Sequence, residues 1–79
     1  MGSIDLVENT ARIVNYCKRS RRKVQIMTEM NFNDLEADAY TTILIRQGLL
    51  GKNLKEYQTT TQGNSYLDTM DRVKNAIRK

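Results

Sequence analysis

Residues 18–23 form the densest run of positive charge in the chain, with five lysine or arginine side chains in six positions. These cations are Lys18, Arg19, Arg21, Arg22 and Lys23. Lysine and arginine bind the phosphate oxygens of nucleic acids. The formal net charge of the whole chain is +4, which also suits an acidic partner. We therefore expect this basic cluster (residues 18–23) to contact double-stranded DNA; the alternative is a solvated junction between two helices.

Acidic residues gather shortly after the basic cluster, in the stretch NFNDLEADAY (residues 31–40). Asp34 and Glu36 fall in the first turn of an expected helix, where a carboxylate interacts favourably with the helix dipole by ~0.3–1 kcal/mol. Asp38 lies beyond that turn; it is either an ordinary solvated charge or an acceptor of a hydrogen bond from cytosine N4 in the major groove. Three acids on the same turns would also repel nearby phosphates. DNA affinity must therefore come from other residues, with Asp38 as a candidate base contact.

The chain has few residues that could perform catalytic or metal chemistry. It contains no histidine, one cysteine (Cys17) and no glycine-rich phosphate loop. The sequence therefore excludes an intramolecular disulfide and an ordinary zinc site, and it offers no catalytic constellation. Cys17 lies on an apolar stripe, which predicts a small buried side chain rather than a reactive thiol. We expect a non-enzymatic protein that uses no metal, no cofactor and no small-molecule substrate.

Length and hydropathy predict one small domain inside the cell. A chain of 79 residues has room for a single hydrophobic core, so residues 1–79 are expected to form one domain. No apolar run approaches the ~18 residues that a membrane-spanning helix needs, and no signal peptide is recognisable. These features predict a cytoplasmic protein with no membrane partner.

Three helices are predicted in the first half of the chain, over residues 3–19, 22–30 and 34–47. Apolar residues recur there at three- and four-residue steps, which is the spacing of one helix face. In the second helix, Val24 and Met27 are expected to face inward, with Ile26 as a further candidate.

The stretch NFN (residues 31–33) separates the second and third helices. Asn31 can adopt the left-handed conformation that ends a helix, and Asn33 can cap the helix that follows. The side-chain amide of Asn33 can also contact a base or a phosphate, which makes it a candidate DNA-binding residue.

A β-hairpin is predicted after the third helix. Leu49–Leu50 form a short extended piece, the residues GKN (51–53) supply turn chemistry, and residues 54–59 alternate as a second strand. Lys52 and Lys55 would give this hairpin its own phosphate contacts, although lysines are also common in exposed turns.

The last predicted element is a C-terminal helix over residues 64–79, with Thr61 as an alternative to Asn64 for its first residue. Its apolar residues fall at spacings of three, three and four: Leu67, Met70, Val73 and Ile77. This seam is longer than so small a core needs, so we expect a symmetric homodimer built on the last helix, either alone or together with the first. The alternative is that the seam covers the core of a monomer. The predicted order α-α-α-β-β-α gives a mainly α fold with a small β-hairpin, which is a winged helix-turn-helix.

Two stretches of the chain resemble small archaeal winged-helix DNA-binding proteins: VQIMTEMNFNDLEADAYTTILIRQGLL and YQTTTQGNSYLD. The shared pattern is I-M-x-E-x-N before the turn, a tyrosine midway along the third helix, a G-L-[LI] exit into the hairpin, and a T-x-x-G that opens the last helix. In this chain it consists of Ile26, Met27, Glu29, Asn31, Tyr40, Gly48, Leu49, Leu50, Thr60 and Gly63. The resemblance spans about residues 23–70. It implies DNA binding, as a transcriptional regulator or a small chromatin protein, and dimerisation through the C-terminal helix.

The acidic third helix leaves a second function open. Proteins of the resembling type tend to carry neutral or basic residues where this chain has Asp34, Glu36 and Asp38. The second hypothesis is a protein–protein interaction module whose third helix docks onto a basic partner. The two hypotheses differ in whether the chain binds duplex DNA at low salt.

Overall fold

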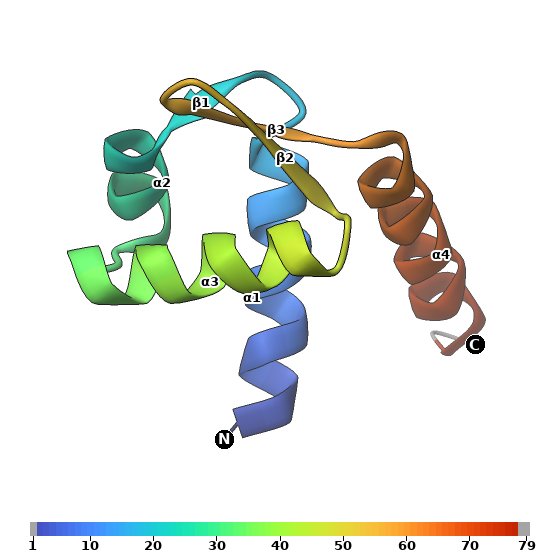
Figure 1. Ribbon diagram of the computed structural model, residues 1–79. Coiled ribbons are helices and arrows are strands. Elements are labelled where there is room, and N and C mark those ends of the chain that lie inside the picture. The colour runs from blue at the N-terminus through green and yellow to red at the C-terminus, as the bar shows by residue number, and fades with distance from the viewer. Residues whose placement is uncertain (1, 78–79) are drawn as a thin grey trace.

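The computed structural model describes residues 2–77, which form four helices and three short strands (Figure 1). In chain order these are α1 (Gly2–Tyr16), β1 (Arg21–Arg22), α2 (Lys23–Met30), α3 (Asp34–Arg46), β2 (Leu50–Asn53), β3 (Glu56–Thr59) and α4 (Thr61–Ile77). This order confirms the mainly α winged helix-turn-helix with a small hairpin. It adds β1, which the sequence did not predict because two residues are too few for a period of two to be recognised.

The three strands form one antiparallel sheet in the order β1-β3-β2. Lys52 pairs with Tyr57 and Asn53 pairs with Glu56, so the turn of the hairpin consists of residues 54–55. The expected turn at residues 51–53 is therefore wrong. Glycine and asparagine suggested that turn, but the observed pairing extends both strands and buries Tyr57.

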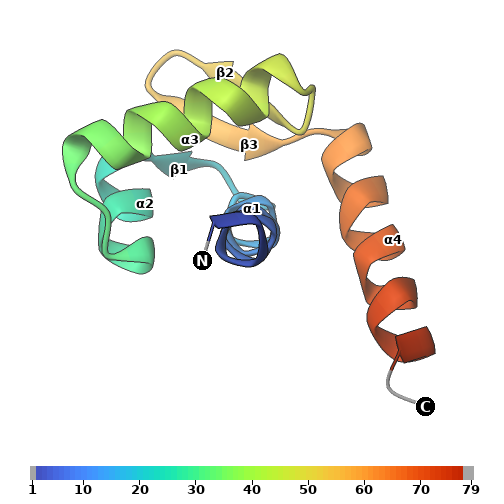
Figure 2. The same ribbon diagram turned by 90° about the horizontal axis from the view of Figure 1, so that it is seen from below.

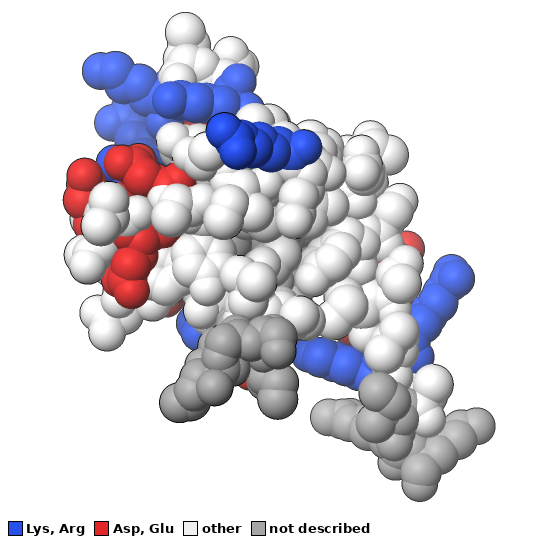
Figure 3. Space-filling view, turned by 60° about the horizontal axis from the view of Figure 1, so that its bottom comes forward, with Lys and Arg blue, Asp and Glu red and all other residues white. Residues whose placement is uncertain are grey.

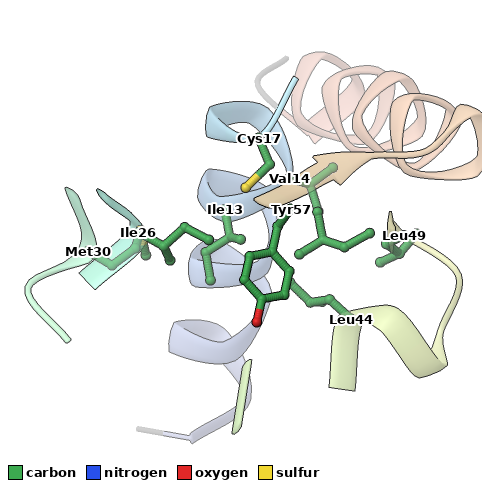
Figure 4. Close-up of a cluster of buried hydrophobic side chains, with 9 residues drawn as sticks. Ile13, Val14, Cys17, Ile26, Met30, Leu44, Leu49 and Tyr57 are labelled. Carbon is green, nitrogen blue, oxygen red and sulfur yellow. The ribbon is translucent and has the colours of Figure 1, made fainter. Parts of the chain in front are cut away.

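The hydrophobic core lies between α1, α2, α3 and the sheet, as the close-up shows (Figure 4). Its buried apolar side chains are Ile13, Val14, Cys17, Ile26, Met30, Leu44, Leu49, Leu50 and Tyr57. Cys17 is fully buried, which confirms the prediction from the apolar stripe. Burial raises the pKa of its thiol to about 11, because the thiolate would lose its hydration, and the charge of Arg21 lowers it in part.

The inward face of α2 matches the prediction at Ile26 and differs from it at Val24. Val24 is 68% exposed, whereas Ile26 and Met30 are buried. α2 is only eight residues long and begins directly after β1, so its inward face is the pair at positions i and i+4. Val24 lies in the first turn on the outer side.

The turn between α2 and α3 forms as the NFN stretch predicts. Asn31 has a φ of 56° and ends α2 in the left-handed conformation. The side chain of Asn33 accepts a hydrogen bond from the Glu36 backbone N–H at 2.8 Å, and the Glu36 carboxylate accepts one from the Asn33 N–H at 2.9 Å. This reciprocal pair is a capping box, and it fixes the start of α3.

The helix α4 begins at Thr61, the earlier of the two expected starting points, and lies beside α1 (Figures 1 and 2). The Thr60 hydroxyl accepts a hydrogen bond from the Gly63 N–H at 3.0 Å and caps the helix. A Cβ atom at Gly63 would overlap the Leu49 carbonyl oxygen, so only glycine allows this close approach. None of the helices within residues 2–77 is both long and apolar enough to cross a membrane.

Candidate nucleic-acid interface

The start of α2 and the β2–β3 hairpin border one shallow groove of about 440 Å³. We call it the wing groove; its lining residues are Arg22, Lys23, Val24, Lys52, Lys55 and Tyr57. Four of the nine residues predicted to bind DNA therefore come together here, although they derive from two parts of the chain. The pairing of β1 with β3 places Arg22 opposite Glu56, next to the turn of the hairpin. That pairing explains how the basic cluster reaches the hairpin.

Lys23 connects the wing groove to the acidic front of α3. Its ammonium nitrogen lies 2.7 Å from a carboxylate oxygen of Asp34 and 2.7 Å from one of Asp38. The hydrogen bonds from Asp34 and then Asp38 hold the pKa of Lys23 above its ordinary value, so it is charged under all usual conditions. One lysine of the basic cluster thus neutralises part of the acidic patch.

The acidic patch remains largely open to solvent. The side chains of Asp34 and Asp38 are 74% and 54% exposed. In the space-filling view, Asp and Glu side chains gather next to a group of Lys and Arg side chains (Figure 3). Two surfaces of opposite charge therefore adjoin on one face of the molecule, and Lys23 bridges them.

Arg21 is turned toward the body of the protein. Its Nε donates a hydrogen bond to the Tyr16 carbonyl oxygen at 3.1 Å, and its guanidinium lies 4.1 Å from the centre of the Tyr16 ring. These contacts hold β1 against the end of α1. Arg21 is half-buried, so its charge is less available to a ligand than that of Arg22, which is exposed.

The first two cations of the basic cluster lie away from the wing groove. Lys18 lines a different groove, which runs between α1 and α4. Arg19 is exposed in the turn that follows α1. The structure therefore divides the basic cluster: Arg22 and Lys23 line the wing groove, and Lys18, Arg19 and Arg21 do not.

The hairpin lysines lie on the exposed side of the wing groove. The ammonium of Lys52 is 5.5 Å from the centre of the Tyr57 ring, which is itself buried in the core. Lys55 is exposed in the turn. The pairing between β2 and β3 fixes both positions relative to Arg22.

Asn33 has a structural role at the start of α3. Its side-chain oxygen caps α3, and its backbone N–H is bound by the carboxylate of Glu36. The residue as a whole is exposed to solvent.

Four exposed residues of α3 were not among the residues predicted to bind DNA. Ala39, Thr42, Ile43 and Arg46 are exposed along this helix, at spacings of three and four residues. Arg46 supplies a cation at the end of α3, remote from the acidic first turns. The signal was present in the sequence, because the buried positions Ala37, Thr41 and Leu44 define the opposite face.

The predicted dimerisation seam lies partly in the groove between α1 and α4. Leu67 and Met70 are half-buried and line this groove, which has a volume of about 530 Å³. Val73 is 44% exposed. The side chain of Ile77 lies outside the described residues. The groove has an apolar floor and a rim that carries both signs of charge (Glu8, Arg12, Lys18, Asp68, Asp71 and Lys74).

A family model described as winged helix-turn-helix matches residues 5–78, which is nearly the whole chain. No curated protein matches the chain.

Proposed function

The chain belongs to the winged helix-turn-helix family, and from this premise we propose that it binds double-stranded DNA as a cytoplasmic, non-enzymatic transcriptional regulator or small chromatin protein. The observation that carries the proposal is the wing groove, where Arg22, Lys52 and Lys55 converge without an ion pair among residues 2–77. Such cations bind phosphates and release the counterions condensed on DNA.

In this proposal the residues of the basic cluster have different roles. Arg22 binds phosphates together with Lys52 and Lys55, while Lys18 and Arg19 add positive charge nearby. Arg21 positions β1 through its contacts with Tyr16. Lys23 is engaged by two carboxylates, so it contributes mainly by reducing the repulsion between α3 and the DNA.

The exposed face of α3 is the second part of the proposed interface. Ala39, Thr42 and Ile43 are small or apolar, which suits contacts with the methyl group of thymine. Arg46 can donate to a guanine edge or a phosphate. Asp38 retains about half of its surface exposed and can accept from cytosine N4, and Asn33 lies at the start of the same helix.

A salt titration tests the proposal directly. Binding of the wild type to random duplex DNA should weaken linearly in log K against log salt. Replacing Arg22, Lys52 and Lys55 with alanine should flatten that slope by about one unit for each lost phosphate contact. Arg72→Ala is the matched control, because it removes one exposed cation from α4 without touching the wing groove. No binding by the wild type at low salt would overturn the proposal.

A protein–protein interaction module is the second candidate function. It is favoured by the exposure of Asp34 and Asp38, with the exposed apolar Leu35 between them. An acidic surface with an apolar centre fits a basic partner that offers an apolar side chain. This candidate predicts no binding to duplex DNA, and loss of partner binding when the two acids become amides.

We also propose that the protein forms a homodimer through α4, with the groove between α1 and α4 covered by a second copy. The mixed charge of the rim supports this, because a two-fold interface pairs each surface with itself and needs both signs. Leu67, Met70 and Val73 supply apolar contact area, and Ile77 extends the same spacing.

Sedimentation tests the dimer separately from DNA binding. At micromolar concentration the wild type should sediment with about twice the chain mass, and Val73→Glu should shift it toward one chain mass because a carboxylate would be buried unpaired. Val73→Leu is the matched control and should remain dimeric. A wild type that sediments as a monomer throughout would refute the dimer and leave the wing groove unaffected.

A further inference from the structure

The tip of the β2–β3 hairpin carries a bulky apolar side chain in an unfavourable backbone conformation. Leu54 is the first residue of the two-residue turn and has a φ of 58°. A positive φ at this position favours glycine, asparagine or aspartate, because their side chains avoid the clash with the backbone. For a large side chain such a φ is a genuine outlier. The backbone therefore disfavours the residue that occupies this place.

Packing within the protein does not compensate for this cost. Leu54 is 88% exposed, more than any other large hydrophobic residue in the described part of the chain. It therefore contributes almost nothing to the core, and glycine would satisfy the turn better. Strained residues of this kind cluster at binding sites, where the surrounding structure imposes the conformation.

Cations flank Leu54 on both sides. Arg22 and Lys55 line a groove of about 570 Å³ around it, together with Asn53 and Glu56. Arg22 and Lys55 also line the wing groove, where Lys52 joins them. Glu56 is half-buried in the sheet and adds one negative charge. The environment of this exposed apolar tip is therefore predominantly positive.

We propose that Leu54 enters the minor groove of DNA and inserts as an apolar wedge against a base step, while Arg22, Lys52 and Lys55 bind the phosphates on either side. The inference rests on the proposed DNA binding and deepens it. The minor groove is about 6 Å wide, which admits a narrow tip but not a helix. Apolar side chains that insert from the minor groove partly unstack the base step and kink the duplex by ~20–90°. Charge complementarity selects DNA as the occupant, because the leucine alone would fit many surfaces.

The wedge supplies sequence preference without hydrogen bonds to bases. Pyrimidine–purine steps such as TA unstack and kink most easily, so they lower the cost of inserting Leu54. We therefore expect tighter binding to duplexes with a central TA step than to otherwise equal duplexes with a stiff A-tract. This preference should depend on Leu54.

Variants at Leu54 separate the wedge from the phosphate contacts. Leu54→Gly and Leu54→Asn both tolerate a positive φ, so each should fold with a melting temperature equal to or above that of the wild type. Leu54→Met keeps a large apolar side chain. The matched control is Leu6→Ala, which truncates a leucine that is 47% exposed in the N-terminal half of α1, at the far end of the molecule from the hairpin turn (Figure 1).

Binding, salt slope and DNA bending are measured on short duplexes with dyes at both ends and a fluorescent adenine analogue at the central TA step. Leu54→Gly and Leu54→Asn should lose the bend and the unstacking signal and bind about tenfold more weakly, the scale of burying one leucine. Their salt slopes should equal that of the wild type, because no charge is lost. Leu54→Met and Leu6→Ala should behave as the wild type.

Two results would contradict the proposed insertion of Leu54. If the wild type binds duplex DNA but Leu54→Gly and Leu54→Asn bind equally well with the same bend, the wedge is refuted and the proposed DNA binding stands. If the wild type fails to bind duplex DNA at low salt, the proposed function itself fails, and the wedge with it.

Discussion

The wing groove and the front of α3 adjoin each other and use their charges in opposite ways. In the wing groove, Arg22, Lys52 and Lys55 have no ion pair within residues 2–77. At the front of α3, Asp34 and Asp38 are both bound to Lys23 at 2.7 Å. The first surface is available to an external partner, whereas the second is partly satisfied within the protein. Charge that is satisfied internally contributes little to attracting a ligand.

The same contrast divides neighbours within the basic cluster. Arg21, Arg22 and Lys23 are consecutive in the sequence, yet one stacks on Tyr16, one is exposed and one bridges two carboxylates. The availability of a cation is therefore set by what the fold places beside it. A run of basic residues does not by itself define a DNA-binding surface.

The largest expected effect comes from releasing Lys23. Replacing Asp34 and Asp38 with asparagine removes two negative charges and frees the ammonium, so non-specific DNA affinity should rise and the salt slope should steepen by about one unit. Glu36→Gln is the matched control, because it removes a charge from the same turns without touching Lys23. Salt titrations of the three proteins measure the effect. If the double amide and Glu36→Gln bind alike, Lys23 does not link the two surfaces.

The converse substitution tests the same contrast from the other side. Lys23→Ala leaves Asp34 and Asp38 without their cation next to the wing groove, so DNA binding should weaken by more than one lost phosphate contact explains. Combining Lys23→Ala with the two amides should restore most of that loss, because the repulsion disappears with the acids. A simple sum of the separate effects would contradict the link.

The sequence predicted those elements whose signals are local. The left-handed Asn31, the cap at Asn33 and the buried Cys17 each follow from a residue type at a fixed distance from an apolar periodicity. The wing groove is different, because it depends on β1 pairing with β3 across more than thirty positions. Nothing in the sequence near Arg21–Arg22 indicates that pairing.

Ion pairs between elements could not be predicted from the sequence, because they too depend on how the fold brings separate elements together. Lys23 and Asp38 belong to different helices, and their contact depends on the angle set by the NFN turn. Acids at the start of a helix could be explained by the dipole alone, so no residue pattern pointed to a lysine partner. The exposed face of α3 could have been found, since its spacing is helical.

Two single substitutions test whether Arg21 and Arg22 have different roles within the basic cluster. Arg22→Ala should reduce the salt slope by about one unit and leave the melting temperature nearly unchanged. Arg21→Ala should change the slope less and destabilise the fold by about 1 kcal/mol, because it loses the hydrogen bond to Tyr16 and the contact with its ring. Thermal unfolding and salt titration measure both. Equal slopes and equal stabilities for the two variants would remove the distinction.

The cap of α3 provides a smaller effect at the edge of the acidic patch. Asn33→Ala should lower the free energy of unfolding by about 1 kcal/mol through loss of the hydrogen bond to Glu36. Asn33→Ser should retain most of that stability, because serine also caps helices. If Asn33 acts only as a cap, chemical denaturation will separate the two variants while DNA affinity, corrected for the folded fraction, stays equal. A loss of affinity in Asn33→Ser would instead show that the amide contacts DNA.

The prediction with the smallest effect at neutral pH concerns the buried thiol of Cys17. The pKa of Cys17 is raised from 9.0 to about 11 in the folded protein, so the unfolded chain releases this proton first as the pH rises. The contribution of Cys17 to stability is therefore complete below pH 9 and is lost as the pH rises toward 11. Denaturation at a series of pH values should show a steeper loss over this range for the wild type than for Cys17→Ala, which lacks the titrating group. A thiol reagent should label the native protein slowly and the unfolded protein fast.

The charge of Arg21 lowers the pKa of the Cys17 thiol, so Arg21→Ala should raise this pKa further, provided that Arg21 is turned inward as its contacts with Tyr16 indicate. Arg22 is exposed, so Arg22→Ala should leave the titration of Cys17 unchanged. An equal shift of the Cys17 pKa in both variants would mean that the two arginines do not differ in orientation.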